Sequence, residues 1–186
     1  MVETTYENLL QAIRQSGKIY EEEKIEKAYR LADKAHAGQL RQSGEPYISH
    51  PLAVAEILVG LGMDSDCICA ALLHDVVEDT DITLDLLQKQ FGHDVAVMVD
   101  GVTKIKKLSL ASKEEKQSEN VRKMLLAMSE DIRVIIIKLA DRLHNIRTLD
   151  FKSEDRQREI ALETMEIYAP IAHRLGIRGI KEELED

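Results

Sequence analysis

Residues 70–80 place four ionisable side chains inside a stretch that is otherwise apolar enough to be core, namely His74, Asp75, Glu78 and Asp79. Burying even a neutral polar group costs roughly 2–7 kcal/mol unless it is paired. On a helix, residues four apart share a face, which would set His74 above Glu78 and Asp75 above Asp79. The pattern therefore predicts a helix whose two rows of polar side chains point into one place.

A second segment, residues 131–149, also sets polar groups into an apolar helix. Its run of β-branched residues at 134–137 alone would suit a strand, but the length of the segment and its later leucines favour a long buried helix. At helical spacing four of its side chains form one polar stripe: Lys138, Asp141, Asn145 and Thr148. A solvated face would carry Glu and Lys over several turns, so this stripe is expected to face a cavity or a ligand.

Composition supports an all-α fold in which helices pack on helices. The chain has 186 residues, 44% of them hydrophobic, but only 4% are aromatic and tryptophan is absent. Leu, Ile, Val and Ala must therefore fill the core, and no segment alternates with period two as a half-buried strand would. The length suits one domain with short appendages.

The charge and the termini limit the classes of function. A formal net charge of −9 argues against nonspecific binding to nucleic acid or to an acidic membrane, while a local basic cluster would still accept a phosphorylated substrate. The N-terminus has no signal-peptide pattern and no apolar run is long enough to span a bilayer. Cys67 and Cys69 are two apart and are interpreted as buried thiols, so a soluble, cytoplasmic protein is expected.

Turn residues divide the rest of the chain. Pro51 suits the first position of a helix, which would put His50 at its N-cap, and Asp64 or Ser65 would cap the helix with His74 to Asp79. Residues 101–118 are the most polar stretch and are interpreted as a mobile loop. The remaining expected elements are a short first helix ending near residue 17, a loop at 38–49, and helices at 21–37, 83–91, 93–99, 119–128 and 153–175.

Two imidazoles and two carboxylates would suit a divalent metal ion, and the candidate ligands are His50, His74, Asp75 and Asp141. Such a mixed shell fits Mn, Fe or Zn and excludes a pure calcium site. Glu78 and Asp79, one turn beyond the ligands, would orient and deprotonate a water and later protonate the leaving group. A satisfied core histidine beside a helix end is the alternative for His74 alone, but the joint pattern favours the metal.

The ordered set of ligands resembles the HD superfamily of metal-dependent phosphohydrolases. The sequence motifs around these ligands resemble those of the hydrolase domain of the Rel/SpoT alarmone enzymes, and the likeness covers about residues 20–174. The motifs are Ala-His-Ala-Gly-Gln at 35–39, Arg-Gln-Ser-Gly-Glu-Pro-Tyr-Ile-Ser-His-Pro at 41–51, Leu-His-Asp-Val-Val-Glu-Asp-Thr at 73–80, and Lys-Leu-Ala-Asp-Arg-Leu-His-Asn-Ile-Arg-Thr-Leu at 138–149.

The resemblance implies an HD-domain helical bundle with a metal site between helices, and hydrolysis of the 3′-pyrophosphate of (p)ppGpp to GDP or GTP with Mn²⁺. It implies the four metal ligands named above and makes Glu78 and Asp79 the catalytic acids. Arg41 and Ser43 resemble the loop that holds the guanine. Asn145 and Thr148 resemble contacts to base and ribose. Many relatives have a basic residue where this chain has Gln42, which weakens any role for a cation there.

The same resemblance predicts a domain plan and a set of partners. Residues 1–19 would form an N-terminal helical extension, 20–175 the hydrolase domain, and 176–186 the lead-in to a synthetase domain, with regulatory domains in a full-length protein. The expected partner is a guanine nucleotide. Two alternatives stay open, which are an HD phosphohydrolase for another nucleotide and a nucleotide-binding module without turnover. The second would have lost metal ligands or the Glu-Asp pair, and this chain has all six residues.

Overall fold

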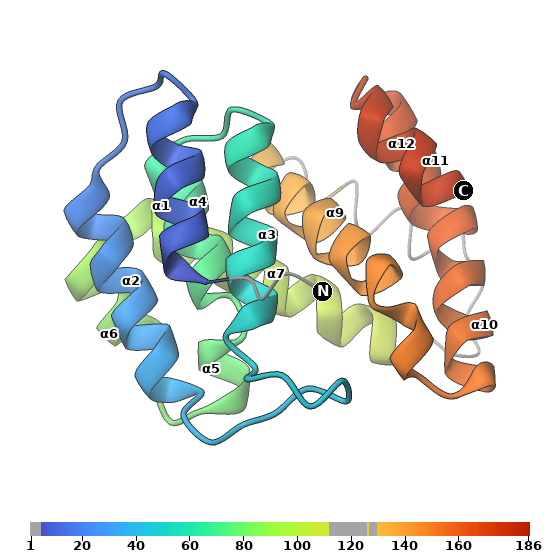
Figure 1. Ribbon diagram of the computed structural model, residues 1–186, viewed down its shortest axis with the longest axis horizontal. Helices are drawn as coiled ribbons and strands as arrows, with labels where there is room; N and C mark the ends of the chain where they lie inside the picture. Colours follow the sequence, from blue (N-terminus) through green and yellow to red (C-terminus); the bar gives the residue numbers. More distant parts are fainter. Residues whose placement is uncertain (1–4, 112–125, 127–129) are drawn as a thin grey trace. The chain divides into compact units, whose positions relative to one another are not determined.

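The computed structural model describes residues 5–111, 126 and 130–186, and these are helical apart from turns and one isolated bridge between Leu40 and Pro46. The chain divides into two compact units, Met1–Lys104 and Ile105–Asp186, and the division falls inside one long helix, α7. The predicted all-α class is confirmed for the part of the chain that is described (Figure 1).

The first unit packs its helices around α4 (Ser65–Leu73). Both α2 (Glu22–Ala35) and α3 (Ser49–Gly60) pack on α4, and α1 (Tyr6–Gln15) packs on α3. Seven consecutive residues of α4, 67–73, are buried, so this helix is the apolar centre of the unit. The unit also contains α5 (Val76–Asp79), α6 (Leu84–Phe91) and the greater part of α7 (His93–Ala111).

Capping side chains fix where several of these helices begin. The oxygens of Thr5, Asp64 and Thr83 accept from the backbone N–H groups of Asn8, Cys67 and Leu86 respectively. Each cap satisfies one of the four N–H groups that a helix start leaves without an intrahelical acceptor. The predicted cap at Asp64 and the predicted helix at 83–91 are therefore confirmed.

The start of α3 differs from the prediction that placed His50 at the N-cap. The helix begins at Ser49, His50 is its second residue and Pro51 its third. The N–H groups of Ser49 and His50 already donate to the carbonyls of Pro46 and Tyr47, at 3.0 and 3.1 Å, so the chain winds up earlier. Pro51 is still tolerated because N–H groups of the first turn have no helical acceptor to lose.

The predicted single helix through residues 74–79 is interrupted. His74 and Asp75 form a turn between α4 and α5. The imidazole Nδ1 of His74 donates to the carbonyl of Ala71, the group that would accept from the N–H of Asp75 in a regular helix. Helical hydrogen bonding between residues four apart resumes after the turn, since the N–H of Asp79 donates to the carbonyl of Asp75 at 3.0 Å.

The prediction of a mobile loop at 101–118 is wrong as far as residue 111. Helix α7 continues from His93 to Ala111, well past the short helix predicted at 93–99. A buried apolar stripe explains the continuation: Val95, Met98, Val99, Val102 and Ile105. The lysines of this region had masked the three-to-four spacing. The rest of the predicted loop and almost all of the helix predicted at 119–128 lie outside the described residues.

The second unit is built on α9 (Ile132–Arg147), which confirms the long buried helix predicted at 131–149. The helix predicted at 153–175 is present but has a π-helical segment before Pro170, whose ring nitrogen has no N–H to continue the ladder. Around α9 the unit contains η1 (Leu149–Phe151), α10 (Glu154–Glu163), η2 (Thr164–Tyr168), α11 (Ala169–Arg174) and α12 (Arg178–Glu185). Both η2 and α12 pack on α9.

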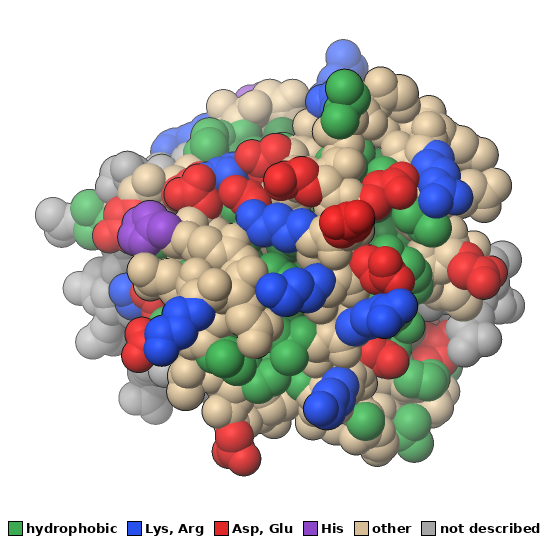
Figure 2. Space-filling view, turned by 90° about the vertical axis from the view of Figure 1, so that its left-hand side faces the viewer, with side chains coloured by type: hydrophobic (Ala, Val, Ile, Leu, Met, Phe, Trp, Pro, Cys, Tyr) green, Lys and Arg blue, Asp and Glu red, His purple; other side chains and the backbone are tan. Residues whose placement is uncertain are grey.

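Charged side chains of both signs are interleaved on the face of the molecule shown in Figure 2. An exposed ion pair of the first unit joins Arg30 to Glu26 at 2.7 Å. Exposed pairs of this kind contribute only about 0–1 kcal/mol each. Among the described residues, the helices include none with the length and apolar character that crossing a bilayer requires.

The cap of α9 gives a prediction about stability. The Asp131 carboxylate accepts from the N–H of Arg133 at 2.9 Å, and hydrogen bonds from the Arg133 side chain lower the pKa of Asp131. Asp131→Ala should therefore lower the free energy of unfolding by about 1 kcal/mol at pH 7, measured by urea denaturation.

The pH dependence of that difference is the control. Because folding lowers the pKa of Asp131 below its ordinary value of 3.8, the contribution is present above pH 3.8. It disappears as the pH falls through the folded pKa. A difference between wild type and variant that is unchanged down to pH 2 would contradict the role assigned to the carboxylate.

Candidate functional site

Three of the predicted metal ligands lie together inside the first unit. His50 comes from the first turn of α3, and His74 and Asp75 from the turn between α4 and α5. All three are buried, at 3–4% exposure. The rings of His50 and His74 meet edge to face with centroids 5.6 Å apart, and each offers a nitrogen within 4.8 Å of the other.

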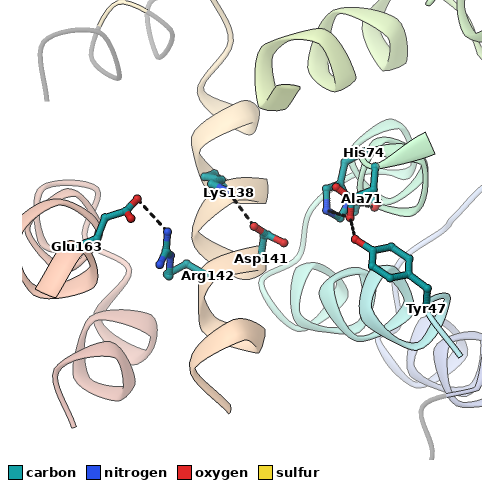
Figure 3. A network of polar contacts seen from close by, with 8 residues as sticks. Tyr47, Ala71, His74, Lys138, Asp141, Arg142 and Glu163 are labelled. Carbon is teal, nitrogen blue, oxygen red and sulfur yellow. Dashed lines mark hydrogen bonds and ion pairs between the residues drawn. The ribbon is translucent and has the colours of Figure 1, made fainter. Parts of the chain in front are cut away.

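The hydrogen bonds of His74 define what its second nitrogen can do. A carbonyl only accepts, so Nδ1 of His74 must carry the proton that it donates to Ala71 (Figure 3). Nε2 of the same ring lies 3.0 Å from Oδ2 of Asp75. In the neutral ring both of these atoms are acceptors, so a cation is required between or beside them, either a second ring proton or a metal ion. Metal-ligating histidines usually donate their other N–H to a carbonyl or carboxylate, as His74 does.

Tyr47 lies against this cluster and was not among the predicted site residues. Its hydroxyl donates to Oδ2 of Asp75 at 2.5 Å (Figure 3). Its ring meets the ring of His50 edge to face, with centroids 6.2 Å apart. On the other side it packs on His36, with centroids 4.7 Å apart. Tyr47 lies within the motif at 41–51, but it is 28 residues from Asp75 in the sequence, and that separation does not predict a contact.

The two predicted catalytic acids follow the cluster on α5. Glu78 is half-buried and Asp79 is exposed, in contrast to the buried His74 and Asp75. The segment thus changes within one turn from core to surface. That arrangement suits groups that exchange protons with water, which a fully buried carboxylate cannot do readily.

The predicted guanine loop is a short ordered turn. The N–H of Arg41 donates to the carbonyl of Glu45 at 2.8 Å, and the N–H of Gly44 donates back to the carbonyl of Arg41 at 2.9 Å. Gly44 has a φ of +86°, a conformation that favours glycine. The side chains of Arg41 and Ser43 are half-buried. Backbone hydrogen bonds therefore set the form of the turn and leave both side chains at its surface.

The other predicted site residues belong to the second unit. Asp141 is buried on α9, and its Oδ2 accepts from Nζ of Lys138 at 3.0 Å (Figure 3). Burial works against the charged form of Lys138, yet Asp141 and Tyr168 together outweigh it and raise the pKa of that lysine above its ordinary value. Asn145 and Thr148 are half-buried further along the same stripe. The predicted stripe thus begins with a buried ion pair and ends nearer the surface.

Sequence reasoning missed a second group of polar contacts on α9. The guanidinium of Arg142 donates to Glu163 at 3.0 Å and lies 4.5 Å from the ring centroid of Tyr168. These contacts tie α9 to α10 and to the π segment η2, which brings Tyr168 onto the helix. The charge of Arg142 in an apolar segment was a visible signal, whereas its aromatic contact depends on tertiary packing.

The two cysteines match their interpretation as buried thiols. Cys67 and Cys69 are both fully buried on α4 and form no disulfide. Burial raises the pKa of the Cys69 thiol to about 12, which keeps it protonated and unreactive at neutral pH. A cysteine nucleophile is therefore disfavoured.

The sequence matches the family profile described as the HD domain over residues 28–178. The chain belongs to the HD domain family. All ten predicted site residues fall within the matched range: Arg41, Ser43, His50, His74, Asp75, Glu78, Asp79, Asp141, Asn145 and Thr148. An HD domain implies a divalent metal ion, and the imidazole and carboxylate donors of His50, His74 and Asp75 in the first unit suit such an ion.

Curated relatives and one solved structure narrow the comparison within the HD family. The chain is 58% identical over 156 residues to the guanosine-3′,5′-bis(diphosphate) 3′-pyrophosphohydrolase of Haemophilus influenzae, covering 84% of this chain and 23% of the relative. It is 55% identical over 163 residues to the bifunctional (p)ppGpp synthase/hydrolase SpoT of Escherichia coli, covering 88% of this chain and 23% of the relative. It is 58% identical over 165 residues to the GTP pyrophosphokinase of Myxococcus xanthus, covering 87% and 22%.

The solved structure is described as a metazoan ortholog of SpoT that hydrolyzes ppGpp. It has a TM-score of 0.71 and 28% sequence identity, and the match covers 90% of this chain and 95% of that one. The HD domain of this chain therefore spans less than a quarter of the length of the curated relatives, but nearly the whole of the solved neighbour.

The buried ion pair on α9 gives a prediction about the metal-free protein. Lys138→Met leaves the Asp141 carboxylate buried without its cation, which should lower the free energy of unfolding at pH 7 by about 3–5 kcal/mol. Urea denaturation in the presence of a chelator measures the difference.

A matched control is Lys104→Met, since Lys104 pairs with Asp100 at 2.9 Å on an exposed helix face. That pair is expected to contribute only about 0.3–0.5 kcal/mol. Equal losses in the two variants would show that burial does not strengthen the Lys138–Asp141 pair.

Proposed function

We propose that this chain is a Mn²⁺-dependent hydrolase that removes the 3′-pyrophosphate of (p)ppGpp, giving GDP or GTP and pyrophosphate. The supporting observation is the buried trio of His50, His74 and Asp75 in a chain 55–58% identical to proteins named as a 3′-pyrophosphohydrolase and as a (p)ppGpp synthase/hydrolase. An HD family member with that donor set is suited to phosphate chemistry. The activity belongs to stringent-response alarmone turnover, and a cytoplasmic location fits it.

The proposed metal ligands are His50, His74, Asp75 and Asp141. The paired acceptors Nε2 of His74 and Oδ2 of Asp75 support a cation in the first unit. Asp141 is proposed as the fourth ligand because it is a buried carboxylate within the HD match, at the position where the HD order expects one. A divalent ion held there would neutralise phosphate charge and lower the pKa of a bound water from about 15.7 towards about 7.

Glu78 and Asp79 are the proposed catalytic acids. Glu78, half-buried one turn beyond the ligands, would take the proton from the attacking water. Asp79, which is exposed, would exchange protons with solvent and return one to the leaving 3′-oxygen of the ribose. The phosphorus–oxygen bond to that ribose oxygen breaks, and the oxygen of water ends on the released pyrophosphate.

Four side chains are proposed to hold the nucleotide. The guanidinium of Arg41 would stack on the guanine, which contributes roughly 0.5–2 kcal/mol in cation–π attraction, and Ser43 would hydrogen-bond beside it. Asn145 and Thr148 would contact base and ribose, because an amide offers both a donor and an acceptor. The half-buried state of all four supports a role at a surface that a ligand covers.

The domain plan predicted from the sequence remains part of this proposal. Residues 20–175 are the proposed hydrolase domain, close to the HD match at 28–178, with an N-terminal helical extension at 1–19 and a lead-in at 176–186. Relatives about four times longer include one named as a synthase and hydrolase together. In a protein of that length, the hydrolase domain would work beside synthetase and regulatory domains.

The first test is incubation with ppGpp and Mn²⁺, with products resolved by anion exchange. We expect GDP and pyrophosphate in equal amounts, and no product in the presence of a chelator. Metal and nucleotide binding without pyrophosphate release would favour a non-catalytic binding module. Turnover of another nucleotide in preference to ppGpp would keep the enzyme class and change the substrate.

Asp75→Asn tests the metal assignment. The amide is nearly isosteric but carries no charge, so the variant should lose manganese and activity while retaining its helical circular dichroism spectrum. Metal content after gel filtration measures the loss. Full metal content and activity in Asp75→Asn would remove this residue from the ligand set.

Glu78→Gln separates chemistry from binding. Since Glu78 is proposed to move a proton rather than to bind the ion, the variant should keep its metal and its affinity for ppGpp. Turnover should fall by roughly 10²–10⁴-fold, the usual contribution of general acid–base catalysis. Loss of metal in Glu78→Gln would instead make this residue a ligand.

A further inference from the structure

Tyr47 stands between two groups of residues to which the proposed function gives separate tasks. Its hydroxyl meets the proposed ligand Asp75, and its main chain closes the turn that contains Arg41 and Ser43. All of these residues belong to the first unit. The proposed function assigns no role to Tyr47, although its main chain contacts one group and its side chain the other.

The hydroxyl acts on one carboxylate oxygen. Oδ2 of Asp75 accepts from Tyr47 at 2.5 Å and lies 3.0 Å from Nε2 of His74. A short hydrogen bond from a neutral hydroxyl to a buried carboxylate is charge-assisted and strongly directional. It fixes the torsion of the carboxylate, and with it the direction in which the second oxygen, Oδ1, points.

The ring of Tyr47 is itself held in position. The N–H of Tyr47 donates to the carbonyl of Gln39 at 2.9 Å, which closes the turn from 39 to 47. The ring packs on the buried ring of His36, whose Nδ1 is in turn 3.0 Å from Oε1 of Gln39. The backbone hydrogen bond fixes the main chain of Tyr47, and the ring contact with His36 restricts its side chain, so its hydroxyl meets Asp75 with little further loss of conformational freedom.

We propose that Tyr47 is a positioning residue that orients Asp75 for the metal ion and ties that ligand to the turn with Arg41 and Ser43. The inference rests on the proposed metal site and adds a residue outside its ligand set. Tyr47 does not touch the ion; it acts through Asp75. Partners of this kind around metal ligands commonly change metal affinity by roughly 10–100-fold when they are removed.

Tyr47→Phe is the direct test, because it removes the hydroxyl and keeps the ring on His36 and His50. We expect the affinity for Mn²⁺, measured by competition with a chelating dye in the absence of nucleotide, to fall by roughly 10–100-fold. The matched control is Tyr20→Phe, whose hydroxyl donates to the backbone carbonyl of Met63 at 2.7 Å in the same unit. That variant should retain the wild-type affinity.

The outcomes separate this inference from the proposed function. A wild-type protein that binds no Mn²⁺ contradicts the metal site itself. A wild-type protein that binds Mn²⁺, with Tyr47→Phe within twofold of it, overturns the positioning role alone. Thermal melting of the metal-free variants supplies the structural readout. If Tyr20→Phe loses as much affinity as Tyr47→Phe, the effect follows general destabilisation and the inference is overturned.

Discussion

Compensation of buried charge is the constraint on which the polar part of this fold depends. Asp75 and Asp141 are each buried in a helical environment that would otherwise expel a carboxylate. Each has its own compensating group within its own unit, the Tyr47 hydroxyl for Asp75 and the Lys138 ammonium for Asp141. The two groups differ in charge, since the Tyr47 hydroxyl is neutral whereas the Lys138 ammonium is a cation. Nε2 of His74 lies 3.0 Å from the same oxygen of Asp75, where a second ring proton or a metal ion would balance the carboxylate.

The local structure follows from the same competition for hydrogen bonds. The apolar run of α4 builds the centre of the first unit, and it ends where the ring of His74 takes the carbonyl of Ala71. Because this turn interrupts the helix, His74 and Asp75 meet each other at 3.0 Å instead of standing in two separate rows. The contact between the two proposed ligands therefore lies within the turn itself.

Sequence periodicity was sufficient for the elements whose polar and apolar faces are distinct. The stripe of Lys138, Asp141 and Asn145 could be identified because the rest of α9 is apolar. Periodicity was insufficient for α7, because several lysines concealed the helical spacing of the buried residues Val102 and Ile105. Contacts between distant segments, such as Tyr47 with Asp75, leave no periodic signal at all. Tyr47 belongs to a recognisable motif, but the motif does not reveal that its hydroxyl donates to Asp75.

The position of Tyr47 also limits how such a site can vary. The backbone N–H of Tyr47 closes the turn that contains Arg41, and its hydroxyl donates to the carboxylate of Asp75. A shift of this residue would therefore act on the turn and on the orientation of the carboxylate together. On the proposed assignment, nucleotide contacts and metal contacts in the first unit are therefore not independent. A change in the turn that moved the ring of Tyr47 would pull its hydroxyl from Asp75. Because a hydrogen bond to a carboxylate is directional, the turn and the ligand are expected to shift together.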